Sequence, residues 1–144
     1  NSKIIHCFRN PLDNILSISR ANFDSGNNYS SSLIESTTVY LDQEKIMSIY
    51  KDRFRPNIYD LNYDLLVKNP HKQIKLLINW LGWEWNESYL SPHLNLRAVY
   101  TASDIQVRSP INSKSIGGWK NYKDMLQPTI KLLTQTERYP NLLS

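Results

Sequence analysis

The pattern that most restricts the fold stands at the start of the sequence, where a short apolar run is followed at once by a turn and a helix. The run covers residues 3–8, and Arg9-Asn10-Pro11 interrupts it. Asparagine is a common N-cap and proline suits a first helical turn, so a helix should start here. Two adjacent isoleucines in so short a run are typical of a strand in a parallel sheet. The pattern predicts a strand–turn–helix unit, on which phosphate sites are commonly built.

Later segments continue this alternation of helix and strand. Apolar residues at helical spacing predict a helix over residues 42–54 with Ile46, Ile49, Tyr50 and Phe54 on one face, and residues 57–63 predict a second strand. Pro70 should begin a third helix that ends at Gly82, because proline suits a first turn and glycine a C-terminal cap. Strands that alternate with helices predict an α/β fold.

The other segments are less regular. Residues 24–38 are rich in serine, asparagine and glycine, and we expect them to form a loop. Residues 83–119 are irregular, first aromatic and then polar. Helical spacing returns over residues 122–133, where Pro128 either breaks a helix or starts a new one.

Composition limits the class of protein more than its function. The chain has 144 residues and a net charge of +4, which is the size of one ordinary domain with a mild excess of cations. Cys7 is the one cysteine, so an internal disulfide is impossible, and the lone thiol favours the cytoplasm. No apolar run approaches the roughly 20 residues of a membrane helix. Because a strand follows Asn1 so closely, we expect a fragment whose fold continues upstream.

The start of the first predicted helix is a candidate anion site. Arg9 lies at the C-terminal end of the predicted strand, where open α/β sheets bind ligands, and the helix terminus adds N–H groups and partial positive charge. Ser17, eight residues further on, reaches a phosphate only if that phosphate lies alongside the helix. Arg20 adds a second charge. The alternative is a surface arginine with a serine that packs the helix.

A second polar segment, residues 101–120, is also suited to an anionic nucleotide. It carries the hydroxyls of Thr101 and Ser103 and the cations Lys114 and Lys120. Hydroxyls and backbone amides would bind phosphate while the cations neutralise its charge. A polar surface loop anchored by its tryptophan is the alternative.

Sequence patterns of several other enzyme classes are missing. Neither GxxxxGK[ST] nor GxGxxG occurs, and neither do HExxH or GxSxG. The histidines are scattered at positions 6, 71 and 93, and we expect no metal site. His6 stands in the predicted buried strand, where most histidines are merely packed.

Four stretches in order resemble the C-terminal part of a sulfotransferase that uses 3′-phosphoadenosine-5′-phosphosulfate (PAPS), of the tyrosylprotein and bacterial tetratricopeptide-linked group. They read KIIHCFRNPLDNILSISR, YDLNYDLLVKNP, IKLLINWLGWEWN and TASDIQVRSPINSKSIGGWKNY, and they span residues 3–122. The resemblance implies a P-loop-type, three-layer α/β sulfotransferase fold, here incomplete. It also implies that residues 1–144 are the C-terminal part of one domain whose 5′-phosphosulfate loop and general base lie upstream.

The resemblance assigns roles to individual residues. Arg9 and Ser17 would bind the 3′-phosphate of PAPS or of adenosine 3′,5′-bisphosphate, and Tyr63 would contact the adenine region. The hydroxyls of Ser103 and Thr101 would line the nucleotide site. Gln106, Val107 and Pro110 would shape the loop that closes over the donor. Two positions depart from the family pattern. Asp64 stands where glutamate is usual, and Gly118 replaces a cation that Lys114 or Lys120 would supply.

The expected reaction of the complete enzyme is metal-free, in-line transfer of a sulfuryl group to an acceptor hydroxyl or amine. The acceptor is open: carbohydrate, peptide, lipid or small molecule. One alternative is a non-enzymatic module that binds anions or, less favoured, single-stranded nucleic acid, for which cations are too dispersed along the chain. Another is part of a P-loop-type kinase that uses ATP.

Overall fold

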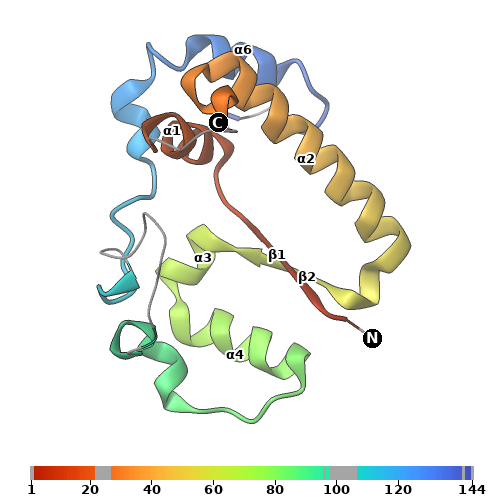
Figure 1. The fold of residues 1–144 in the computed structure, drawn as a ribbon, viewed down its shortest axis with the longest axis vertical. Helices are drawn as coiled ribbons and strands as arrows, with labels where there is room; N and C mark the ends of the chain where they lie inside the picture. The colour runs from red at the N-terminus through yellow and green to blue at the C-terminus, as the bar shows by residue number, and fades with distance from the viewer. Residues whose placement is uncertain (1, 22–26, 96, 98–106, 141, 144) are drawn as a thin grey trace. The chain divides into compact units, whose positions relative to one another are not determined.

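The apolar run at the start of the chain pairs with a strand some fifty residues later. In the computed structural model, which describes residues 2–21, 27–95, 97, 107–140 and 142–143, β1 (Ile4–Phe8) lies parallel to β2 (Ile58–Asn62). The register runs from Ile4 opposite Ile58 to Phe8 opposite Asn62. Both predicted strands are confirmed, and so is the α/β class, since helices connect the two strands (Figure 1). The prediction that the first strand is buried is wrong, because Ile4 is 49% exposed and Ile5 is 43% exposed, and of the five residues of β1 only His6 is buried.

Both strands belong to the first of two compact units, which combines Asn1–Phe8 with Pro56–Lys114. Here α3 (Tyr63–Lys68) and α4 (Pro70–Leu81) follow β2, and the short 3₁₀ turns η3 (Glu87–Leu90) and η4 (Pro92–Leu94) come after them. The predicted helix from Pro70 is confirmed: Asn69 caps its start, and Gly82 ends it with a φ of +76°, which favours glycine.

His6 is packed within this unit, as the sequence suggests. Its side chain is 7% exposed, and its Nδ1 lies 3.1 Å from an Asp60 carboxylate oxygen. Asp60 is its partner across the ladder, so the carboxylate gives the buried His6 Nδ1 a polar partner.

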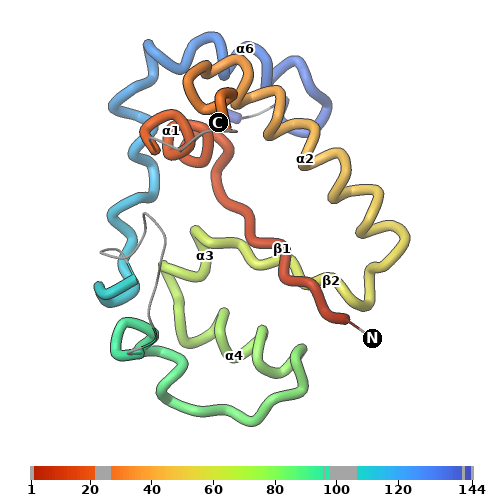
Figure 2. The backbone as a smooth tube through the Cα atoms, viewed as in Figure 1, coloured from red at the N-terminus to blue at the C-terminus, as the bar shows by residue number. Residues whose placement is uncertain are grey.

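The second unit combines Arg9–Arg55 with Ser115–Ser144. It holds α1 (Pro11–Arg20), η1 (Asn28–Ser31), α2 (Leu33–Phe54), η5 (Gly118–Tyr122) and α6 (Gln127–Thr134), and α2 packs against both α1 and α6. Figure 2 traces the chain through these elements. Its core is aliphatic, with four side chains that are fully buried: Leu12, Ile15, Leu126 and Leu133. Pro128 lies in the first turn of α6, so it starts a helix rather than breaking one.

The second helix is longer than its apolar spacing predicts. It begins at Leu33 because the Ser32 hydroxyl accepts the Glu35 amide as an N-cap, so the expected loop over residues 24–38 is wrong for residues 33–38. The face predicted to be apolar is exposed, at 58% for Ile49 and 43% for Phe54. The buried residues of α2 are mostly polar instead, and they are Ser36, Thr37, Tyr40 and Glu44.

Two of these buried polar side chains, Tyr40 and Glu44, have their partners at residues 138–139. Glu44 is 5% exposed, and its carboxylate lies 2.9 Å from an Arg138 guanidinium nitrogen. The hydroxyls of Tyr40 and Tyr139 lie 3.1 Å apart. Burial raises the pKa of the Tyr40 hydroxyl, and the hydrogen bond to Tyr139 raises it further. Because the buried Glu44 carboxylate is paired with Arg138, this ion pair holds residues 138–139 against α2.

No helix in the described part of the chain combines the length and the apolarity that crossing a bilayer requires.

Adjacent residues before α6 allow a matched test of the core. Leu126→Ala should lower the free energy of unfolding by about 2–5 kcal/mol, because the leucine is 0% exposed and its loss leaves a cavity. Met125→Ala should cost under about 0.5 kcal/mol, since Met125 is 46% exposed. Urea unfolding followed by circular dichroism measures both, and equal costs would contradict the packing of this segment.

The raised pKa of Tyr40 predicts a loss of stability at alkaline pH. The unfolded tyrosine releases its proton near pH 10 while the folded one keeps it, so the unfolded state binds fewer protons and stability falls as pH rises. Above that pH, wild type should lose up to about 1.4 kcal/mol per pH unit relative to Tyr40→Phe. Urea unfolding between pH 8 and 11 gives the two slopes, and parallel slopes would refute the effect.

Candidate functional site

The first turn of α1 is closed by its own cap. The Asn10 side-chain oxygen accepts the amides of Leu12 at 2.9 Å and Asp13 at 3.3 Å, and Pro11 occupies the first turn. The predicted cap is therefore confirmed. Because Asn10 uses these two amides, the helix start would act on an anion through its dipole and through neighbouring side chains.

The polar residues of α1 share one face. Asp13, Ser17 and Arg20 stand at helical positions i, i+4 and i+7, which lie above one another on a helix. Asp13 is 3% exposed, whereas Ser17 and Arg20 are exposed. Exposure of Ser17 does not fit the alternative in which it packs the helix. The Arg20 guanidinium lies 5.6 Å from the centre of the Tyr122 ring on η5.

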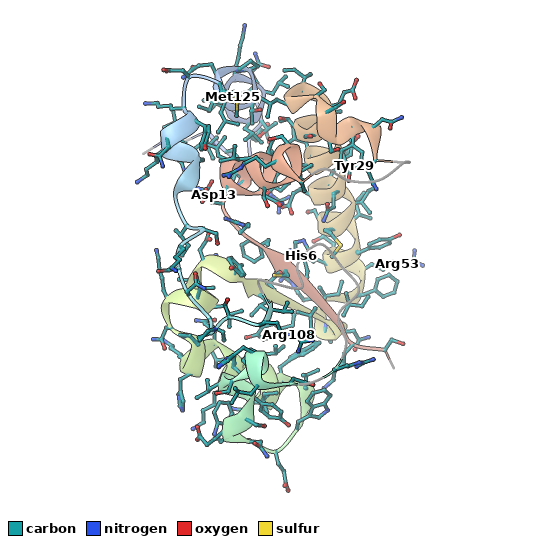
Figure 3. All side chains as sticks on the ribbon, turned by 60° about the vertical axis from the view of Figure 1, so that its left-hand side comes forward. His6, Asp13, Tyr29, Arg53, Arg108 and Met125 are labelled. Carbon is teal, nitrogen blue, oxygen red and sulfur yellow. The ribbon has the colours of Figure 1, made fainter. Side chains whose placement is uncertain are left out.

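Asp13 joins this face to a segment more than a hundred residues away. One carboxylate oxygen accepts the Gly117 amide at 2.6 Å and the other accepts the Trp119 amide at 2.9 Å. Figure 3 labels Asp13 on α1. Sequence reasoning missed this role, because an acidic residue in a first turn is explained by the helix dipole alone. Of the backbone amides in this segment, those of Gly117 and Trp119 donate to Asp13.

Arg9 lies beside the same contact. Its side chain is 18% exposed, and its Nη2 donates to the Ser115 carbonyl at 2.6 Å. The same nitrogen lies 3.8 Å from the Asp13 carboxylate, at the long end of the ion-pair range. Arg9 is therefore not a simple surface arginine. It fixes the start of the 115–119 segment at the beginning of α1.

The two candidate lysines belong to different units of the chain. Lys120 is exposed on η5 and turns back over the loop, since its Cε lies 3.9 Å from the position that a Cβ on Gly117 would take. Lys114 belongs to the first unit, where its amide donates to the Asn112 side chain at 3.2 Å. The second unit therefore holds Lys120 together with Arg9 and the polar face of α1.

The remaining predicted residues belong to the first unit or lie outside the described residues. Tyr63 begins α3 in the first unit, directly after Asn62, whose side chain caps that helix. Thr101, Ser103 and Gln106 lie outside the described residues. Val107 and Pro110 are exposed.

The second unit thus holds three of the candidate cations. Arg9 Nη2 lies 3.8 Å from the Asp13 carboxylate, Arg20 at the last residue of α1 lies over the Tyr122 ring, and Lys120 on η5 lies over Gly117. Arg9 lies at the start of α1, while Ser17 and Arg20 lie further along the helix. Cations and a hydroxyl along one helix suit a multivalent anion such as a phosphate group. In the described residues, no group of three or more His, Cys, Asp or Glu side chains is arranged to hold a metal ion.

The fold and this cluster define an α/β protein with a candidate anion site at the start of its first helix. A model of the sulfotransferase family matches residues 1–87, which include Arg9, Ser17 and Arg20. The chain therefore belongs to the sulfotransferase family. A protein of Aquifex aeolicus (strain VF5), described as uncharacterized, is 30% identical over 138 residues. That match covers 94% of this chain and 18% of the relative, so the chain spans less than a fifth of the relative's length.

Two adjacent glycines test the loop that Asp13 holds. Gly117 has a φ of +72°, so Gly117→Ala should cost about 1–2 kcal/mol of stability. Gly118 has an ordinary φ, and a Cβ there would lie 3.7 Å from the Asp13 carboxylate, so Gly118→Ala should cost well under about 1 kcal/mol. Thermal unfolding compares the two, and a larger loss for Gly118→Ala would contradict this loop conformation.

Proposed function

We propose that the chain carries the 3′-phosphate part of the PAPS site of a sulfotransferase, at the polar face of α1. The observation that carries the proposal is that one unit holds Arg9 just before α1, Ser17 and Arg20 on α1, and Lys120 on η5, which contacts α1. Membership of the sulfotransferase family supplies the reaction class. The donor nucleotide bears a 3′-phosphate, an anion of the kind that this cluster suits.

Each residue would contribute a different part of the binding. The Arg9 guanidinium would supply a charge-assisted contact to the 3′-phosphate, and the exposed Ser17 hydroxyl would donate a hydrogen bond along the helix. Arg20 and Lys120 would add positive charge. Lys120, rather than Lys114, is our candidate for the cation that the family carries at the position of Gly118, because it folds over the loop held by Asp13.

These residues bind and orient the donor rather than perform the proton transfer. The donor supplies the sulfuryl group, and the binding residues hold its nucleotide in place and neutralise charge near it. We propose that residues 1–144 form part of one sulfotransferase domain, with the 5′-phosphosulfate loop and general base on an upstream segment. Tyr63, Thr101, Ser103 and Lys114 remain predicted nucleotide contacts.

The acceptor and the setting of the enzyme also belong to the proposal. A carbohydrate, peptide, lipid or small molecule with a hydroxyl or amine would accept the sulfuryl group. The tyrosylprotein and tetratricopeptide-linked type is proposed on the four motifs, and the cytoplasm on the lone Cys7.

The 3′-phosphate contact can be tested by comparing two nucleotides that differ only in that group. Arg9→Ala should weaken binding of adenosine 3′,5′-bisphosphate by about 10- to 100-fold, and Ser17→Ala by about fivefold, because a charge-assisted bond and a hydroxyl bond are lost. Binding of AMP should change little. Isothermal titration calorimetry on the full-length protein measures both ligands.

Arg53→Ala is the matched control for removing one positive charge from the same unit. Arg53 is exposed on α2, and its guanidinium lies over the Phe54 ring at 5.5 Å. This variant should leave both affinities unchanged. If wild type bound AMP as tightly as the bisphosphate, the proposed site would be refuted. Tight, steeply salt-dependent binding of single-stranded nucleic acid that tolerates Ser17→Ala would favour the binding-module alternative.

A further inference from the structure

Asp13 is a buried carboxylate inside a group of residues that we assign to binding an anion. It is 3% exposed, and its nearest partners are the Gly117 and Trp119 amides, at 2.6 and 2.9 Å. A carboxylate next to a phosphate site repels the ligand, so its presence needs a reason. Burying it is tolerated because two amides and the positive end of α1 offset its charge.

The reason lies in what the carboxylate holds. The oxygen that accepts the Gly117 amide also lies 3.8 Å from Arg9 Nη2, and that nitrogen donates to the Ser115 carbonyl at 2.6 Å. Arg9, Asp13 and the 115–119 segment therefore form one closed set of contacts. Lys120 follows Trp119 directly and lies over Gly117, so its position depends on the same loop.

We infer that Asp13 is a positioning residue of the 3′-phosphate site, which fixes the Arg9 guanidinium and the loop carrying Lys120 at the start of α1. The inference rests on the proposed function. Asp13 contacts no part of the nucleotide itself, and it acts through the two cations. Because the Gly117 and Trp119 amides are engaged by Asp13, side chains rather than those amides bind the phosphate.

Asp13→Asn separates positioning from simple electrostatics by the sign of its effect. The amide keeps one oxygen for one loop N–H but turns an NH₂ donor toward the other, so the loop and Arg9 lose their fixed place. A positioning role therefore predicts weaker binding of adenosine 3′,5′-bisphosphate, by about tenfold, with AMP binding unchanged. If Asp13 only repelled the phosphate, removing its charge would strengthen binding of the bisphosphate, and that result would overturn the inference.

A double-mutant cycle tests whether Asp13 acts through Arg9. Calorimetry on the full-length protein compares wild type, Asp13→Asn, Arg9→Ala and the double variant with both nucleotides. In the Arg9→Ala background, Asp13→Asn should cost under about threefold, because the residue it positions has gone. Fully additive losses would overturn the role through Arg9.

Tyr139→Phe is the control for a general loss of stability in the same unit. It removes the hydroxyl that lies 3.1 Å from the Tyr40 hydroxyl and leaves the bonds of Asp13 unchanged. It should lower the melting temperature without changing the ratio of the two affinities. If Asp13→Asn weakened both nucleotides equally, like any destabilising change, Asp13 would be structural only and the inference would be wrong.

Two further results keep the failures apart. If Asp13→Asn does not fold, Lys120→Gln tests the loop instead, and it should weaken bisphosphate binding about fivefold while AMP binding is unchanged. No effect of Lys120→Gln would overturn the positioning of that lysine.

If wild type shows no preference for the bisphosphate over AMP, the proposed function fails and this inference fails with it. If wild type shows the preference and Asp13→Asn keeps it, only the inference fails.

Discussion

The second unit depends on one carboxylate that accepts two backbone amides. Asp13 holds Gly117 and Trp119 against the first turn of α1, and the Arg9 guanidinium closes the same set of contacts through Ser115. Trp119 is 9% exposed and belongs to the core together with Leu12 and Ile15. The bonds of Asp13 and Arg9 thus connect the core residue Trp119 to the start of α1. The positions of Arg9 and Lys120 therefore depend on the packing of the unit.

The assignment to the sulfotransferase family and the geometry of α1 support each other at the level of chemistry. A helix with a capped start presents a buried acid, an exposed hydroxyl and an exposed arginine on one face. An anion beside that face would lie near Arg20 of α1 and Lys120 of η5. The Leu12 and Asp13 amides already donate to Asn10. Positive charge along such a surface lowers the electrostatic cost of bringing a multiply charged anion to it.

Local patterns predicted much of this fold, and long-range contacts explain what they missed. The first strand, the Asn10 cap, Pro11 and the helix ending at Gly82 follow from residue preferences over a few positions. The predicted start of α2 is wrong, because the Ser32 cap stands within a stretch whose composition is typical of a loop. The contacts of Asp13 could not be predicted, since no periodicity links it to Gly117. The candidate cations were found from the sequence, while their arrangement required coordinates.

The partners of Asp13 lie 104 and 106 residues further along the chain. During synthesis, Arg9 and α1 leave the ribosome long before the loop whose amides Asp13 accepts. The contacts of Asp13 are therefore completed late, since contacts of such wide sequence separation form slowly. Until then, a nascent chain has Arg9 and Arg20 without the loop that carries Lys120. A chain released early would contain the sequence of α1 but lack the two amides that its buried carboxylate accepts.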